Sequence, residues 1–164
     1  MIAPAIHRAP SGRPVGPEQL AAIVAAYAAA PRLWRACVRH DTLRRWYVRL
    51  AWTRQHEVWL LGWTEGQAVE LHDHGDSGGA FVVSDGALCE EHVDGTGLRR
   101  LHHGPGRVWS FASGHVHTVW NPGPGAATSI HAYAPPLRSM SFYAHDARAG
   151  LRRTRVERVE HVGP

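Results

Sequence analysis

The chain has 164 residues, which is enough for one domain with a sizeable core and short for two. Hydrophobic residues make up 44% and charged residues 20%, as in ordinary globular proteins, and no apolar run is long enough to span a membrane. The net charge is +4, but the 18 basic residues, all arginine, are scattered along the chain. Because a nucleic-acid surface needs a concentrated basic patch, we expect neither a nucleic acid nor a membrane as partner.

The N-terminal part predicts an arm followed by helix. Residues 1–16 are rich in Pro, Gly and Ala without a continuous apolar segment, so we expect a flexible arm, no signal peptide and a cytoplasmic location. Pro17 opens the stretch PEQLAAIVAAYAAA, in which apolar residues recur at helical spacing until Pro31. A second short helical piece is expected over 33–38. We assign residues 17–164 to a single domain that includes these helices.

From residue 44 onward, short segments rich in Val, Trp, Tyr and Leu alternate with Gly, Pro and Asp turns. Strands are predicted near 45–52, 57–63, 68–74, 79–84, 87–93, 98–102, 107–111, 115–120, 128–134, 139–145 and 152–160. Many short strands at this spacing are typical of a mainly β fold, a sandwich or a barrel, with the helices flanking it.

Side chains two residues apart share one face of a strand, and four predicted strands carry polar sets of this kind. The sets are Tyr47 with Arg49, His72 with His74, His115 with His117, and Ser129 with His131 and Tyr133. A closed barrel would gather these faces around one pocket. A His-x-His pair on a strand suits a metal ion, since imidazole binds Fe, Zn, Cu and Ni, although two surface histidines are an equally ordinary reading of the pair alone.

The spacing of glycines and histidines adds to this hypothesis. One series is Gly66, His72, His74, Gly79 and Gly86, and a second is Gly106, Ala112, Gly114, His117 and Asn121. Together they resemble the two motifs of the cupin superfamily. The resemblance implies a cupin-type jelly-roll β-barrel with His72, His74 and His117 as metal ligands. The cupin Glu ligand falls on Gly79, which leaves a neutral three-histidine site that would favour an anionic ligand such as a thiolate.

The segments ELHDHGDSGGAF, HTVWN and SIHAYAPP narrow the resemblance to the cysteine dioxygenase family of thiol dioxygenases, over roughly residues 44–146. This resemblance implies Fe(II) at the three histidines, a small thiol carboxylate and O₂ as substrates, and a sulfinate product. It also implies a monomer.

Further roles are carried over from the same family. Ser129, His131 and Tyr133 match its Ser-His-Tyr relay beside the metal, and Arg49 in YVRL matches the arginine that grips the substrate carboxylate. Tyr47 and Met140 would complete the substrate site. Animal members have cysteines at the positions of Gly79 and Met140, and the first of these crosslinks to the tyrosine. We therefore expect no Cys-Tyr crosslink here, as in many bacterial members.

The remaining notable residues have plainer interpretations. Cys37 and Cys89 are expected to be small buried side chains. His102 and His103 adjoin Gly104 and Pro105, which favours a solvated turn. His115 is the rival of His117 as third ligand, and the motif spacing favours His117.

We therefore predict a cupin that oxidises L-cysteine to cysteine sulfinic acid. Arg49 favours cysteine over 3-mercaptopropionate, because family members for the latter tend to have Gln at that position. Two other hypotheses stay open. One is a cupin enzyme with another metal or reaction, and the other is a metal-bearing cupin that senses or binds a ligand without catalysis.

Overall fold

The computed structural model describes residues 14–95 and 97–159. The predicted arm therefore lies almost entirely outside the described residues. One α-helix, α1 (Pro17–Ala28), and two 3₁₀ turns, η1 (Pro31–Leu33) and η2 (Arg35–Cys37), precede the strands. The strands are β1 (Trp46–Trp52), β2 (Glu57–Trp63), β3 (Ala68–His72), β4 (Gly78–Asp85), β5 (Leu88–Asp94), β6 (Gly97–His103), β7 (Val108–Phe111), β8 (His117–Trp120), β9 (Ala127–Ala134), β10 (Ser139–Asp146) and β11 (Gly150–Arg158).

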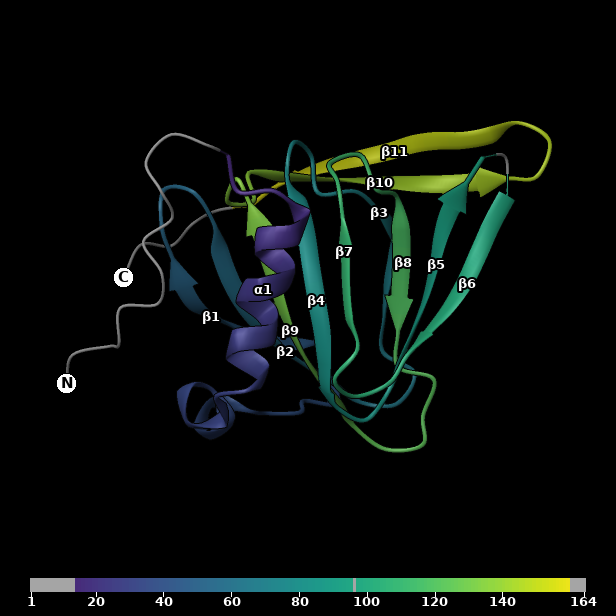
Figure 1. Ribbon diagram of the computed structural model, residues 1–164. Helices are drawn as coiled ribbons and strands as arrows, with labels where there is room; N and C mark the ends of the chain where they lie inside the picture. The colour runs from purple at the N-terminus through teal and green to yellow at the C-terminus, as the bar shows by residue number, and fades with distance from the viewer. Residues whose placement is uncertain (1–13, 96, 160–164) are drawn as a thin grey trace.

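Helix α1 begins at Pro17, whose missing N–H costs nothing at the first helical position, and Gln19 reaches back to accept a 3.0 Å hydrogen bond from the Gly16 N–H. The helix packs on β4, β7 and β9 through Leu20 and Val24, which are fully buried. Burying each of them stabilises the fold by about 1.5–3 kcal/mol. Figure 1 shows α1 lying along the outer side of β4 and β9. Within the described residues, no helix is long and apolar enough to cross a membrane.

The strands form two sheets that pack face to face. One has five strands in the order β1-β2-β9-β4-β7, and the other has six in the order β11-β10-β3-β8-β5-β6. Strands that are neighbours in a sheet are often far apart in sequence, as β2 and β9 are, which is the pattern of a jelly roll (Figure 1). The predicted mainly β, cupin-type fold is confirmed, as two open sheets rather than one continuously hydrogen-bonded barrel among the described residues.

Strand β9 shows how the alternation of side chains builds both cores. Ile130, Ala132 and Ala134 face outward and are buried under α1 with Leu20 and Val24. The residues between them face the space between the sheets, where Tyr133 packs in a second apolar cluster with Trp63, Phe81 and Phe111. The polar set predicted for this strand therefore lies inside the jelly roll, as expected from its two-residue spacing.

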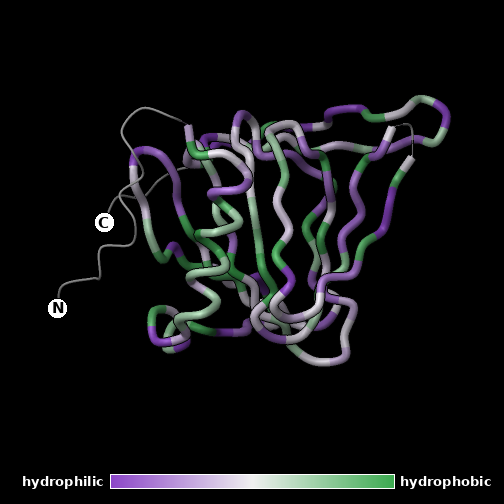
Figure 2. The backbone as a smooth tube through the Cα atoms, in the orientation of Figure 1, coloured by the Kyte–Doolittle hydropathy of each residue, from purple (hydrophilic) through white to green (hydrophobic). Residues whose placement is uncertain are grey.

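One edge of the six-stranded sheet is polar. Strand β11 is an exposed edge strand with the sequence GLRRTRVER, and Figure 2 shows hydrophilic stretches along it. Charged residues on a sheet edge discourage pairing with another chain.

The structure corrects several local predictions. The helical piece expected over 33–38 is the pair of 3₁₀ turns η1 and η2, because Pro31 and the short segment cannot sustain an α-helix. Cys37, expected to be buried, is exposed at the end of η2, whereas Cys89 is buried on β5. Strands β3 and β8 are shorter than predicted, so His74 and His115 lie just outside them.

Candidate metal centre and its surroundings

Three histidine rings meet between the two sheets. His72 ends β3 and lies directly across the ladder from His117, the first residue of β8, and His74 follows two residues after His72. The ring centroids are 4.8 Å apart for His72 and His74, 4.8 Å for His72 and His117, and 5.2 Å for His74 and His117. One ligand nitrogen of each ring lies within 4.8 Å of the others, and all three side chains are buried.

The hydrogen bonds of these rings leave nitrogens available for a metal ion. His72 Nδ1–H donates to the Glu70 carbonyl at 2.7 Å, and His117 Nδ1–H donates to Glu90 Oε1 at 2.7 Å, which leaves Nε2 of each ring as the lone-pair nitrogen. His117 Nε2 and His74 Nδ1 are buried without a hydrogen-bond partner among the described residues. Buried, unsatisfied imidazole nitrogens are uncommon, and converging ones fit a divalent metal ion.

The protonation state of the three rings suits ligation. Burial first, and then the neighbouring imidazoles, hold the pKa of His72 and His74 well below the ordinary value. Burial also lowers the pKa of His117, although the hydrogen bond to Glu90 opposes this. Each ring is therefore neutral near pH 7, which is the form that binds a metal.

A buried carboxylate forms hydrogen bonds with one side of the histidine cluster. Glu90 on β5 is fully buried, and its Oε1 accepts hydrogen bonds from His117 Nδ1–H at 2.7 Å and His115 Nε2–H at 2.8 Å. Its Oε2 accepts from His103 Nε2–H at 2.8 Å. Burial alone would raise the pKa of Glu90, but the three imidazole hydrogen bonds hold it well below the usual range. The carboxylate thus stays ionised and fixes the tautomer and orientation of His117.

This arrangement settles several histidines that the sequence left open. His103 was expected in a solvated turn and is instead buried at the end of β6, because Glu90 accepts its N–H. The His115 Nε2–H donates a hydrogen bond to the same carboxylate. Glu90, His115 and His117 also form a second group whose atoms lie close enough together to hold a metal ion. Glu90 was missed by sequence reasoning, and the only signal for it is an acidic pair inside the apolar strand LCEEHV.

The position of Gly79 is filled from a neighbouring strand. Gly79 lies across the ladder from both Tyr133 and Phe111, and a Cβ at this position would overlap the Phe111 ring and lie 3.1 Å from Tyr133 Cδ1. The Phe111 ring stacks on His74 with centroids 5.4 Å apart. The space beside Gly79 is therefore occupied by the Phe111 ring.

The polar row on β9 is connected at both ends. Trp63 Nε1–H donates to Ser129 Oγ at 2.9 Å, Ser129 Oγ lies 2.8 Å from His131 Nε2, and His131 Nδ1 lies 3.3 Å from the Tyr133 hydroxyl. Ser129 Oγ can accept the indole N–H and donate its own O–H to His131 Nε2, and in that tautomer the His131 Nδ1–H faces the Tyr133 oxygen. The Tyr133 O–H is left to donate elsewhere.

Burial keeps this row neutral. It lowers the pKa of His131 to about 3 and raises the pKa of Tyr133 above its ordinary value. The Tyr133 ring stacks on His74 with centroids 4.8 Å apart, so the phenol adjoins the histidine cluster. Trp63, for which the sequence predicted no role, is the additional member of the row.

The predicted substrate-binding residues lie on two other strands. The Arg49 guanidinium is 20% exposed, lies 5.6 Å from the Trp59 ring centroid, and has Nη1 3.9 Å from Glu57 Oε2. Tyr47 is 57% exposed, with its ring edge-on to Trp59. Met140 on β10 is half-buried and shares a strand face with Phe142, whose ring centroid lies 6.0 Å from that of His72.

Asp73, between the first two histidines, accepts hydrogen bonds from two backbone N–H groups and one side chain. Its Oδ1 accepts from the Gly75 and Ser141 N–H groups, and its Oδ2 accepts a 2.6 Å hydrogen bond from the Tyr143 hydroxyl. These bonds tie the segment that carries His72 and His74 to β10.

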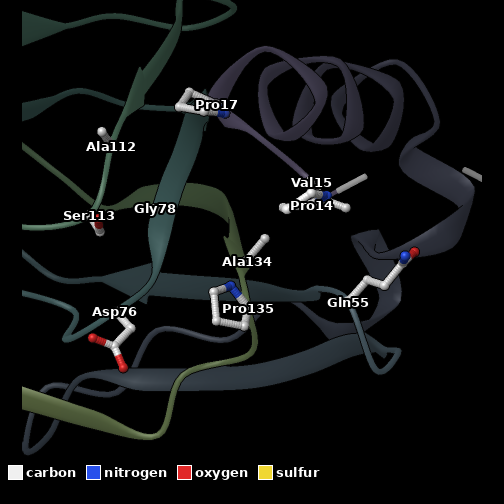
Figure 3. Close-up of a pocket in the computed structure, with 10 residues that line it drawn as sticks. All are labelled: Pro14, Val15, Pro17, Gln55, Asp76, Gly78, Ala112, Ser113, Ala134 and Pro135. Atoms are coloured by element: carbon white, nitrogen blue, oxygen red, sulfur yellow. The ribbon is translucent and has the colours of Figure 1, made fainter. Parts of the chain in front are cut away.

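A cavity of about 500 Å³ elsewhere in the described structure is a different feature. Its lining residues are Pro14, Val15, Pro17, Gln55, Asp76, Gly78, Ala112, Ser113, Ala134 and Pro135 (Figure 3). Ala134 belongs to the outward-facing set of β9, so this cavity lies beside the start of α1 and does not include the histidine cluster.

A jelly roll with three converging histidines between its sheets defines a cupin-fold protein with a candidate metal site. Solved structures share this fold. They include TT1209 from Thermus thermophilus, with a TM-score of 0.56 and 18% identity, covering 62% of this chain and 93% of that one. A cupin superfamily protein from Desulfitobacterium hafniense has a TM-score of 0.54 and 11% identity, covering 62% of this chain and 87% of that one. A conserved protein with a double-stranded β-helix domain from Klebsiella pneumoniae has a TM-score of 0.55 and 21% identity, covering 62% of this chain and 80% of that one.

The family is shown by sequence. Residues 5–146 match the description of cysteine dioxygenase type I, and the chain belongs to that family. Membership supports a cupin enzyme of the dioxygenase type and implies a thiol and O₂ as substrates, which agrees with the three-histidine site.

Proposed function

We propose that the protein is an Fe(II)-dependent thiol dioxygenase that converts L-cysteine to cysteine sulfinic acid. The proposal rests on one observation: three neutral, buried imidazoles lie next to the phenol of Tyr133. The ligands of the proposed iron site would all be histidines, with no carboxylate. Bound at these histidines, Fe(II) would supply the Lewis acidity that deprotonates a thiol and the one-electron chemistry that O₂ requires. As part of the proposal, the enzyme works in the cytoplasm as a single-domain monomer.

The overall reaction balances without a further reductant. The thiol and O₂ combine into a sulfinic acid, both oxygen atoms end on sulfur, and the four electrons that sulfur loses are those that O₂ gains. No co-substrate besides the thiol and O₂ has to be bound. The protein has to bind the thiol and O₂ next to each other, which turns an encounter of separate molecules into a local reaction.

The row of Ser129, His131 and Tyr133 would keep a proton on the Tyr133 hydroxyl beside the substrate sulfur. With His131 protonated on Nδ1, the chain of donors from Trp63 through Ser129 and His131 would leave the Tyr133 O–H free to donate to a group bound at the histidine cluster. Since burial raises the pKa of Tyr133, the phenol keeps its proton and donates a hydrogen bond to a developing negative oxygen. His131, with a pKa of about 3, stays neutral and orients the phenol without adding charge.

The substrate carboxylate would be held on β1. Arg49 offers a planar fork of donors on the inner face of this strand, and Tyr47 covers it from the solvent side. Met140 would supply an apolar wall against the substrate methylene. The Gly79 position holds no sulfur, so Tyr133 works as an unmodified phenol in this proposal.

The experiment that tests the proposal is O₂ uptake by Fe(II)-loaded protein, with L-cysteine and 3-mercaptopropionate in parallel and products identified by mass. Uptake with a sulfinate product supports thiol dioxygenation, and the preferred thiol decides the substrate. Absence of uptake with both thiols at full iron occupancy would contradict it, and would favour another cupin reaction or a non-enzymatic ligand-binding cupin.

A pair of variants tests the ligand assignment in the same preparation. His117→Ala should lose both iron and activity, because no other nitrogen replaces Nε2. His115→Ala is the matched control and should keep its iron, since His115 Nε2 is committed to Glu90. Iron retained in His117→Ala and lost in His115→Ala would transfer the third ligand to His115.

A further inference from the structure

The His74 ring is held differently from the rings of the other two candidate ligands. His72 donates its Nδ1–H to the Glu70 carbonyl, and His117 donates its Nδ1–H to Glu90, so a hydrogen bond fixes the orientation of each of these rings. By contrast, no hydrogen bond from a described residue holds the His74 side chain, and its Nδ1 is buried without a partner. Other contacts must therefore orient the His74 ring.

Two aromatic rings stack on His74. The Phe111 ring lies with its centroid 5.4 Å from that of His74 and its plane at 27°, and the Tyr133 ring lies at 4.8 Å and 30°. The two rings come from the strands on either side of β4, since Gly79 pairs with Phe111 on β7 and with Tyr133 on β9. The imidazole of His74 thus packs against a ring from each neighbour of β4.

The Phe111 ring is itself closely confined. It occupies the space that a side chain at Gly79 would take, because a Cβ there would overlap the ring. It also stacks on His115, with centroids 4.6 Å apart and 22° between the planes, and lies tilted against His117 at 5.3 Å. In a densely packed interior, a ring enclosed in this way has little room to reorient. Phe111 is therefore a rigid surface on which the His74 ring can rest.

We propose that Phe111 is a positioning residue of the metal centre, whose ring holds the His74 imidazole in the orientation in which it binds the metal ion. Stacking would do for His74 what hydrogen bonds do for His72 and His117. The inference rests on the proposed function only in taking the three histidines as ligands of a divalent metal ion, and it does not depend on the reaction. Stacked rings stabilise each other beyond the area that they bury. Without the Phe111 ring, the His74 imidazole would have to be ordered when the metal binds, and the metal affinity would fall accordingly.

The test is chelator competition for Co(II), used as the probe metal, by the full-length protein. Phe111→Leu keeps an apolar side chain and removes the ring. It should weaken Co(II) binding by about 2- to 12-fold, the range that corresponds to the loss of one aromatic contact. The absorption bands of bound Co(II) should also shift, because they report the geometry of the ligands. Phe111→Met, a second variant without a ring that fills more of the volume, should show the same loss, whereas Phe111→Tyr keeps the ring and should retain the wild-type affinity and bands.

Phe81→Leu is the matched control for the loss of a buried ring. Phe81 is fully buried in the same apolar cluster as Phe111, and its ring stacks at 5.1 Å on His131, which is not one of the three candidate ligands. Both leucine variants should lose unfolding free energy in denaturant titrations of the metal-free protein, because both leave a cavity in the core. Phe81→Leu should nevertheless bind Co(II) with the wild-type affinity and bands. A purely structural role of Phe111 predicts instead that the two variants behave alike toward the metal.

Wild-type Co(II) affinity and bands in Phe111→Leu and Phe111→Met would overturn the inference, and so would an equal loss of affinity in Phe81→Leu or Phe111→Tyr. A wild-type protein that binds no Co(II) would overturn it together with the ligand assignment. Oxygen uptake with thiols is recorded separately on Fe(II)-loaded samples. Co(II) binding that depends on Phe111, without thiol oxidation, would refute the dioxygenase proposal and leave the role of Phe111 standing. Sulfinate formation by the wild type, with unchanged metal binding in Phe111→Leu, would do the reverse.

Discussion

The carboxylate of Glu90 offers the sharpest perturbation of the histidine cluster. Glu90→Gln keeps the shape of the side chain but replaces one oxygen by an NH₂ group. The carboxylate accepts three imidazole N–H groups at 2.7–2.8 Å. Since an amide has one oxygen, at least one imidazole N–H must face another donor. Every remaining hydrogen bond also loses its charge assistance.

The expected magnitude follows from these contacts. A hydrogen bond to a charged group is worth about 1 kcal/mol more than one between neutral groups, so three of them put the loss of unfolding free energy at roughly 3 kcal/mol. Loss of the partner that orients a ligating histidine typically weakens metal binding by about 10- to 100-fold. Both effects should occur together, because His117 is shared between the carboxylate and the metal site.

Denaturant unfolding of the metal-free protein and chelator competition for Fe(II) measure the two quantities. Glu91→Gln is the control, since this neighbour forms a 2.6 Å ion pair with Arg100 at the partly exposed surface of the same strand and should leave metal affinity unchanged. Wild-type iron affinity in Glu90→Gln would refute the view that Glu90 orients His117.

Glu90 also determines how the stability of the fold changes at low pH. The pKa of Glu90 is held well below its usual range in the folded state, whereas the unfolded value is about 4.3. The stabilisation is therefore complete above the unfolded pKa and is lost as the pH falls below it toward the folded pKa. Stability should decline below about pH 5, and Glu90→Gln should lack this part of the decline. Two further substitutions test other parts of the site. Gly79→Cys should lower the unfolding free energy by about 1–3 kcal/mol through overpacking against Phe111, and intact mass should show no loss of two hydrogens, because the ring occupies the path to Tyr133; a crosslinked product of normal stability would contradict this. Tyr143→Phe removes the 2.6 Å hydrogen bond to Asp73 and should cost about 1.5–3 kcal/mol in denaturant unfolding, with unchanged stability as the contrary result.

The fold and the convergence of His72, His74 and His117 could be predicted because they depend on short-range patterns. The alternation in β9 separates Ile130 and Ala132, under α1, from His131 and Tyr133 in the interior, and a two-residue period suffices to see this. His72 and His74 are close in sequence, so their convergence needs no knowledge of the fold. Only His117 required the longer spacing of the second motif.

The residues that were missed depend on how distant strands are aligned. Glu90 accepts hydrogen bonds from His103 on β6 and His117 on β8, because β5 pairs with both strands. No local sequence pattern marks a carboxylate that will be surrounded in this way. The filling of the Gly79 position by Phe111 is likewise a consequence of the pairing of β4 with β7.

The most direct test of the account is the fate of the oxygen atoms. Fe(II)-loaded protein should be given L-cysteine under isotopically labelled O₂, and the product examined by mass spectrometry. The account predicts a sulfinic acid in which both added oxygen atoms carry the label, formed in proportion to the O₂ consumed. A product with oxygen from water, or a disulfide as the sole product, would contradict thiol dioxygenation by this site.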